Sequence, residues 1–388
     1  VFEEDGAIYR QINQAGKDDY ELFMQSGLYE TLAKRDLIVS HTEVPAKKIA
    51  TSDAYKIIKP TPIPFISYPY EWSFSQLKDA ALLTLRIQKI ALKFGMILKD
   101  ASAYNIQFIG KKPIFIDTLS FMPYEEGKPW EGYKQFCEHF LAPLALASYT
   151  SLESLKLLRT EIEGVPLGLA VSLLPKRARL SFGLLTHIYL HNNAQHKYKN
   201  IASDAPNKEI NPQKVSRFAL EGLTSSLENT IKKLSLPKHD TEWGDYYTFT
   251  NYTEKGFRQK RKMVAYFLSL CKPNPTVVWD IGANNGEFSS IASDRGIYTV
   301  AFDIDPLAVE RNYLNTSDKN QNKHMLPLLQ DVVNPSPANG FLGTERSSLQ
   351  QRGPADVVMA LALIHHLAIG RNLPFERIAE LLHTIGKE

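Results

Sequence analysis

The segment from Thr276 to Gly286 is the feature that most constrains the fold. It reads TVVWDIGANNG, a short run of apolar, β-forming residues followed by Asp280, Gly282 and Gly286 in the pattern DxGxxxG. This pattern is typical of the turn between a strand and a helix at the edge of a parallel sheet. Glycine at 282 lets the backbone approach a ligand closely, and glycine at 286 favours a tight turn. The sequence therefore predicts a strand, a turn and a helix here.

Three further apolar runs follow along the chain. The run from Tyr298 to Phe302 ends in Asp303, and the run MLPLLQ ends in Asp331. A fourth strand is expected within Ala355 to Ile364. An acidic residue at the tip of the second strand is placed to accept hydrogen bonds from both hydroxyls of a ribose. Four apolar strands separated by helix-capable segments predict a doubly wound α/β sheet with a cofactor crevice at the strand carboxyl ends.

A dinucleotide-binding domain is the main alternative for such a sheet. Domains that bind NAD usually carry GxGxxG, whereas here Asp280 precedes a single pair of glycines four residues apart. The chain resembles class I S-adenosylmethionine-dependent methyltransferases at four motifs in order. DIGANNG is similar to their first motif, AFDID to their ribose motif, LLQDVV to their adenine-side acidic motif, and ALALIHHL to their fourth-strand motif. The resemblance implies a methyltransferase-type, Rossmann-like sheet with S-adenosylmethionine as cofactor.

The same resemblance implies roles for individual residues. Asp280 and Gly282 would line the methionine end of the cofactor. Asp303 would hold its ribose, and Asp331 would meet the adenine amino group. The complete cofactor site implied in this way comprises Asp280, Gly282, Ala283, Asn284, Gly286, Asp303, Ile304, Asp331 and Ala360.

Two histidines follow the fourth apolar run. His365 and His366 are the candidates for a catalytic role, since a histidine at this place could touch substrate or cofactor. A capping or packing role fits them equally well. No general base can be named from the sequence, and methyl transfer needs one only where the nucleophile still carries its proton.

The last segment of the chain is expected to be a helix at residues 375–385. A complete class I methyltransferase has seven strands, and only strands 1–4 are recognised here. We therefore expect a C-terminally truncated sheet, or one that another chain completes, because an uncovered edge strand is a liability. Such a chain is expected to bind cofactor weakly and could be inactive.

A second set of polar residues lies in the first half. Asp100 and Asn105 are five residues apart, and Asp117 follows a β-forming run. This arrangement resembles kinase-like phosphotransferases, which implies that Asp100 positions a hydroxyl, that Asn105 and Asp117 bind magnesium, and that ATP is bound with it. Leu98 stands in place of the usual histidine, and Arg10 in place of the expected lysine. The alternative is that these side chains only cap turns.

The two resemblances imply that the chain divides into a kinase-like α+β domain at residues 1–235 and a methyltransferase domain at residues 236–388. Within the first, Tyr20 to Lys34 has helical spacing, and Phe74 to Phe94 is an amphipathic helix that Gly95 ends. Residues 130–190 are mainly helical. The aromatic segment Trp243 to Tyr252 either walls the cofactor pocket or packs between the domains.

Composition places few limits on partners. The 45 basic and 42 acidic residues leave a formal charge of +3, which gives no strong signal for nucleic acid. The two cysteines, Cys137 and Cys271, are isolated, so a disulfide framework or a zinc site is not expected. No apolar run reaches the length of about 20 residues that a membrane span needs. We expect a cytoplasmic protein without a membrane partner.

Three long runs, LKDASAYN through FIDTLSF, WEGYKQFCEHFLAPLAL and ERSSLQQRGPADVVMALALIHHL, resemble a family of bacterial two-part methyltransferases that includes nodulation protein NoeA. This resemblance implies a methyltransferase whose acceptor, a small molecule or a macromolecule, is unknown. Two alternatives remain open. One is a kinase-like phosphotransferase with an attached S-adenosylmethionine-binding module, and the other is a non-catalytic adaptor that senses S-adenosylmethionine.

Overall fold

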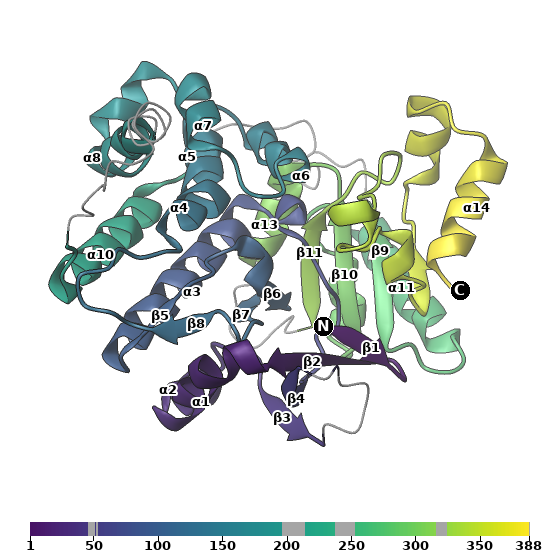
Figure 1. The fold of residues 1–388 in the computed structure, drawn as a ribbon. Helices are drawn as coiled ribbons and strands as arrows, with labels where there is room; N and C mark the ends of the chain where they lie inside the picture. Colours follow the sequence, from purple (N-terminus) through teal and green to yellow (C-terminus); the bar gives the residue numbers. More distant parts are fainter. Residues whose placement is uncertain (46–50, 52, 196–213, 237–252, 316–323, 388) are drawn as a thin grey trace. The chain divides into compact units, whose positions relative to one another are not determined.

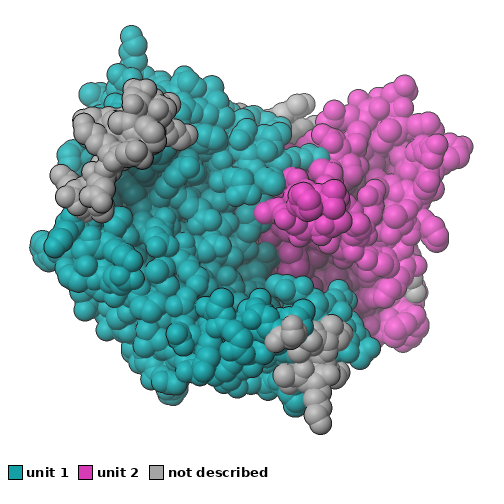
Figure 2. Space-filling model, viewed as in Figure 1, with its two compact units in different colours: residues 1–63, 77–107, 113–237 teal, residues 64–76, 108–112, 238–388 magenta. Residues whose placement is uncertain are grey.

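The computed structural model describes residues 1–45, 51, 53–195, 214–236, 253–315 and 324–387 (Figure 1). They form two compact units, coloured teal and magenta in Figure 2. Unit 1 comprises residues 1–63, 77–107 and 113–237, and unit 2 comprises residues 64–76, 108–112 and 238–388. A single division at residues 235 and 236 therefore does not describe the units, because two short segments from the first half of the chain pack within unit 2.

Unit 2 is built on a four-stranded parallel sheet, drawn in green in Figure 1. Its strands are β9 (Val277–Ile281), β10 (Tyr298–Asp303), β11 (Met325–Leu329) and β12 (Val357–Met359). Their order is β11-β10-β9-β12, and every neighbouring pair is parallel. In sequence order this is 3-2-1-4, the order with which doubly wound α/β sheets begin. The predicted α/β class with a parallel sheet is confirmed.

The strands of unit 2 form because both faces of the sheet are buried. Parallel strands with two covered faces read as continuous apolar runs, and every residue of β10 is buried. The helices along this part of the chain are α11 (Glu254–Leu270), α12 (Ser289–Ser293), α13 (Pro306–Asn315) and α14 (Phe375–Ile385). Helix α11 buries Val264 and Leu268 in one apolar cluster with Val278 of β9.

Residues 64–76, which we call the strap, belong to unit 2 although the main segment of that unit begins only at residue 238. The Phe65 ring packs edge-on against Trp279 and Phe302, with ring centroids 5.6 and 6.0 Å apart. The short 3-10 helix η2 (Pro69–Glu71) follows. Residues 108–112 are attached in a similar way, since the Tyr313 hydroxyl donates to the carbonyl oxygen of Lys111 at 3.1 Å.

Unit 1 begins with an antiparallel sheet in the order β1-β2-β4-β3. The strands are β1 (Phe2–Glu4), β2 (Ala7–Asn13), β3 (His41–Val44) and β4 (Ala54–Pro60). Two smaller pairs follow along the chain, β5 (Met96–Leu98) with β8 (Phe121–Pro123), and β6 (Ile106–Ile109) with β7 (Lys112–Phe115), of which residues 108–112 belong to unit 2. The larger helices are α1 (Lys17–Gln25), α2 (Leu28–Lys34), α3 (Phe74–Lys93), α5 (Ala142–Tyr149), α7 (Leu167–Leu173) and α10 (Arg217–Lys233).

Two helix predictions for the first half had different outcomes. Helix α3 ends at Lys93, followed by Gly95 at φ 73°, as predicted. The single helix predicted from Tyr20 to Lys34 is wrong, because the chain forms α1 and α2 with Gly27 between them at φ 81°. A left-handed residue cannot continue an α-helix, and glycine adopts that conformation at little cost. Within the described residues, no helix is long and apolar enough to cross a membrane.

Candidate functional site

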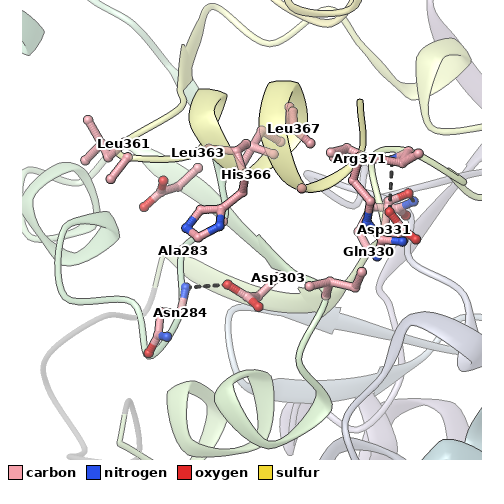
Figure 3. A pocket seen from close by; sticks show the side chains of 18 of the residues that line it. Ala283, Asn284, Asp303, Gln330, Asp331, Leu361, Leu363, His366, Leu367 and Arg371 are labelled. Carbon is pink, nitrogen blue, oxygen red and sulfur yellow. Dashed lines mark hydrogen bonds between the residues drawn. The ribbon is translucent and has the colours of Figure 1, made fainter. Parts of the chain in front are cut away.

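A cavity of about 490 Å³ lies in unit 2 at the carboxyl ends of its parallel strands (Figure 3). Residues at or just after the ends of β9, β10 and β11 line it, and so do residues that follow β12. Eight residues singled out from the sequence are among the lining residues: Asp280, Gly282, Ala283, Asn284, Asp303, Ile304, Asp331 and His366. Side chains predicted from separate strand ends therefore share one space.

Three residues of the predicted site do not line this cavity, namely Gly286, Ala360 and His365. Gly286 has φ 82°, and a Cβ atom there would lie 2.6 Å from the side-chain amide of Asn312. Its glycine is therefore required by packing beneath the turn, and nothing in the geometry places it against a ligand. Ala360 directly follows β12, and the His365 ring lies beside the ring of His366.

The turn after β9 brings main-chain atoms to the cavity wall. Gly282 has φ 78°, and its N–H donates to the carbonyl oxygen of Phe302 at 2.8 Å. Ala283 donates to the same oxygen at 2.9 Å. A Cβ atom on Gly282 would lie 3.2 Å from Leu363 Cδ1, so a larger residue would press against Leu363, which also lines the cavity.

Asp280 is a buried carboxyl group at the end of β9, with 2% of the residue exposed. Its Oδ2 accepts a hydrogen bond from the Ser289 hydroxyl at 2.6 Å. The pKa of Asp280 is raised to about 7, mainly by burial and also by the nearby Asp303, against the opposing effects of the Ser289 hydrogen bond and of Lys260. Asp280 is therefore partly protonated near neutral pH, and a cationic ligand would favour its ionised form.

Asp303 ends β10 and is 9% exposed. Its Oδ2 accepts from the N–H of Asn284 at 2.7 Å, and its Oδ1 accepts from the N–H of Asp305 at 2.9 Å. Burial raises the pKa of Asp303 as well. Because each carboxylate oxygen can accept about two hydrogen bonds, both oxygens keep capacity for a donor from the cavity.

Gln330 and Asp331 continue the wall beyond β11. The N–H of Gln330 donates to the carbonyl oxygen of Asp303 at 2.8 Å, which joins the ends of β10 and β11. Asp331 Oδ1 accepts from the N–H of Val333 at 2.9 Å and so holds its own turn. In Figure 3 these two side chains lie near Arg371, while His366 lies on the other side of Asp303.

His366 is the predicted catalytic candidate that reaches the cavity. It begins a short π-helix, η11 (His366–Gly370), a distortion that occurs often at functional sites. Burial lowers the pKa of His366, and the neighbouring His365 lowers it further, the two ring centroids being 4.0 Å apart. The imidazole is therefore mainly neutral at pH 7, the form that can accept a proton.

Sequence reasoning missed two basic residues of the cavity, Lys260 and Arg371. Lys260 lies in α11, and its Nζ lies 4.4 Å from the centroid of the Phe288 ring. Arg371 follows η11, where no strand end or motif marked it. The aromatic segment at 243–252 lies outside the described residues, so both interpretations of it stay predictions.

The residues singled out in unit 1 are only partly brought together. The Asn105 amide donates to Ser120 Oγ at 3.3 Å, and that hydroxyl donates to Asp117 Oδ2 at 2.5 Å. Arg10 forms an ion pair with Asp117. Asp100 accepts from the N–H of Ser102 at 2.9 Å, within its own turn. Among the described residues, no group of three or more His, Cys, Asp or Glu side chains could hold a metal ion. The magnesium and ATP assignment stays a prediction.

No protein-family model matches the chain. The chain is similar to Nodulation protein NoeA of Rhizobium meliloti (strain 1021), with 37% identity over 318 residues. This similarity supports a NoeA-like family. The aligned part is 81% of this chain and 65% of NoeA, so the chain spans less than two thirds of that relative. The name of NoeA refers to nodulation and states no reaction.

Proposed function

We propose that unit 2 binds S-adenosylmethionine in the cavity and that the chain is a methyltransferase, in which unit 1 is an accessory part. One observation carries the proposal. Asp280, Asp303 and Asp331, which end or follow three adjacent parallel strands, line one cavity together with the Gly282 turn. Ligands of open α/β sheets bind at this edge.

The cavity fits S-adenosylmethionine in size and in chemistry. Its volume of about 490 Å³ falls within the range of roughly 300 to 1,000 Å³ that small-molecule sites occupy. Asp303 offers two oxygens to the two hydroxyls of a ribose, and Asp331 offers an acceptor to an adenine amino group. Asp280 would lie near the charged methionine end. Its raised pKa fits a partner that is cationic, as the ammonium and sulfonium groups are.

When bound, S-adenosylmethionine would supply the methyl group. The residues of this chain would bind it, exclude water and hold an acceptor in line, and alignment of this kind lowers much of the barrier to group transfer. The neutral imidazole of His366 could take a proton from an acceptor that is not already deprotonated.

Calorimetry separates the proposal from its alternatives. We would titrate the chain with S-adenosylmethionine and, separately, with ATP plus magnesium, and assay methyl release in the presence of cell extracts as a source of acceptors. Binding of S-adenosylmethionine with methyl transfer supports the proposal. Binding without transfer points to an adaptor, and binding of ATP with magnesium alone points to a phosphotransferase. Asp303→Ala is the site variant, and Asp117→Ala in unit 1 is its control.

A further inference from the structure

The strap carries a buried ion pair that the proposed cofactor site does not explain. Glu71 and Arg352 have side chains that are 1% and 5% exposed. The guanidinium donates from Nη1 to Glu71 Oε2 at 2.8 Å and from Nη2 to Oε1 at 2.6 Å. The rings of Phe65 and Tyr68 each lie with their centroids 4.9 Å from the guanidinium carbon. The pair is therefore enclosed, and both partners belong to unit 2.

Glu71 is also linked to the cavity wall, both through one hydroxyl and directly. Ser336 Oγ donates to Glu71 Oε1 at 2.8 Å. In the amide orientation that satisfies its neighbours, Gln330 Nε2 donates to Ser336 Oγ at 3.0 Å and to Glu71 Oε1 at 3.2 Å, and its oxygen accepts from the Ser336 N–H at 2.9 Å. Gln330 lines the cavity and directly precedes Asp331. A continuous set of hydrogen bonds thus runs from the strap to the cavity wall.

We propose that Glu71 is a positioning residue for the adenine end of the site: it fixes the Gln330 side chain and, through it, the orientation of Asp331. This inference rests on the proposed function. A carboxylate that is buried costs free energy unless it is paired and hydrogen-bonded, and an ion pair with apolar neighbours often adds little net stability. Specifying one arrangement is the contribution that such a pair can make instead. Here the pair would specify the position of Gln330, a residue of the cavity wall.

The strap contains its own control. Ser75, also in the strap, donates its hydroxyl and its N–H to the carboxylate of Glu310 in α13, the latter at 2.9 Å. Glu310 is buried like Glu71, but neither it nor Ser75 lines the cavity. Removing the charge of Glu310 therefore loosens the strap and leaves the hydrogen bonds between Glu71, Ser336 and Gln330 in place.

The test compares Glu71→Gln with Glu310→Gln in the full chain. We would measure thermal unfolding, the Kd for S-adenosylhomocysteine by calorimetry well below both unfolding midpoints, and the Kd for S-inosylhomocysteine, whose base carries a carbonyl oxygen in place of the amino group. We expect both variants to unfold at lower temperature. Only Glu71→Gln should lose about tenfold in affinity for S-adenosylhomocysteine, with a smaller preference for it over the inosine analogue.

Three outcomes separate the inference from its foundation. If the unsubstituted chain binds no S-adenosylhomocysteine, the proposed function fails. If the unsubstituted chain binds S-adenosylhomocysteine, either of two results overturns the positioning role. In the first, Glu71→Gln keeps the original Kd and base preference. In the second, Glu310→Gln loses as much affinity as Glu71→Gln does. If Glu71→Gln does not fold, Ser336→Ala replaces it, because this change removes the bridging hydroxyl and keeps the ion pair. Ser336→Ala must then shift the base preference in the same direction, and an unchanged preference overturns the role.

Discussion

A buried histidine of unit 1 and two buried carboxyl groups of unit 2 differ in how far the chain itself satisfies them. In unit 1, the buried His187 uses both ring nitrogens within the chain, Nδ1 with the Tyr133 hydroxyl at 2.9 Å and Nε2 with Ser226 Oγ at 2.8 Å. In unit 2, the buried carboxyl groups of Asp280 and Asp303 lie at a cavity, and burial raises the pKa of both. Buried groups that are complete within the chain indicate a structural role. Buried groups that keep acceptor capacity at a cavity indicate a ligand.

The largest expected effect concerns the ion pairs of the two units. Arg352→Met leaves the carboxylate of Glu71 buried without its cation, and we expect this change to destabilise unit 2 by about 3 to 5 kcal/mol. Arg10→Met removes the partner of Asp117, whose side chain is 21% exposed, and we expect a loss of about 1 kcal/mol or less. Urea unfolding followed by circular dichroism measures both. Equal losses would contradict the distinction between an enclosed pair and a hydrated one.

The second prediction concerns acid. Burial and, to a smaller extent, the nearby His191 lower the pKa of His187 to about 4. The unfolded chain takes up this proton near pH 6.5 and the folded chain only near pH 4. The contribution of neutral His187 to the free energy of unfolding is therefore fully present above pH 6.5. It is lost as the pH falls from 6.5 to 4, and the loss is at most about 3 kcal/mol.

Unfolding of His187→Gln at pH 7.5 and pH 4.5 checks this expectation. The variant should lose less stability on acidification than the unsubstituted chain does, although it starts from a lower value at pH 7.5. An identical loss in both proteins would assign the acid sensitivity to other groups.

The third prediction concerns the cavity itself. Asp303→Ala removes two acceptors for the ribose hydroxyls, and charged hydrogen bonds of this kind contribute roughly 1.5 to 3 kcal/mol. We expect S-adenosylmethionine to bind about 10 to 100 times more weakly to this variant, as measured by calorimetry. Asp117→Ala in unit 1 should leave the affinity unchanged. A loss in Asp117→Ala of the same size would remove the distinction between the units.

The smallest effect is a pH dependence of binding. The ionised form of Asp280 suits a cationic ligand, and the pKa of this group in the free chain is about 7. Affinity should therefore rise about tenfold from pH 6 to pH 8 and then level off. The stability of the ligand-free unit changes with pH in the opposite direction to the affinity. Because the carboxyl pKa is raised in the folded chain, stability is lost as the pH rises toward 7. Asp280→Asn should flatten both profiles, and an unchanged slope in the variant would exclude this group as their source.

The features that the sequence predicted are those that local pattern encodes. Asp280, Asp303 and Asp331 could be found because parallel strands end at one edge, so a polar residue after each apolar run is placed without further information. The strap could not be found in this way. The four prolines between residues 54 and 72 are typical of a connector, and Arg352, the partner of the strap, lies 281 residues beyond Glu71. Lys260 and Arg371 reach the cavity from a helix and a loop, where no periodic pattern marks the inward direction.

The strap also sets an order of events during synthesis. Glu71 leaves the ribosome 281 residues before Arg352, an interval of roughly 15 to 60 s at ordinary rates of elongation. Throughout that interval its carboxylate has no cation to pair with and must stay hydrated, so Phe65 and Tyr68 cannot yet close around it. The strap therefore keeps an exposed aromatic segment until the part of the chain that contains Arg352 is made. Chaperones that bind such segments would find their target here.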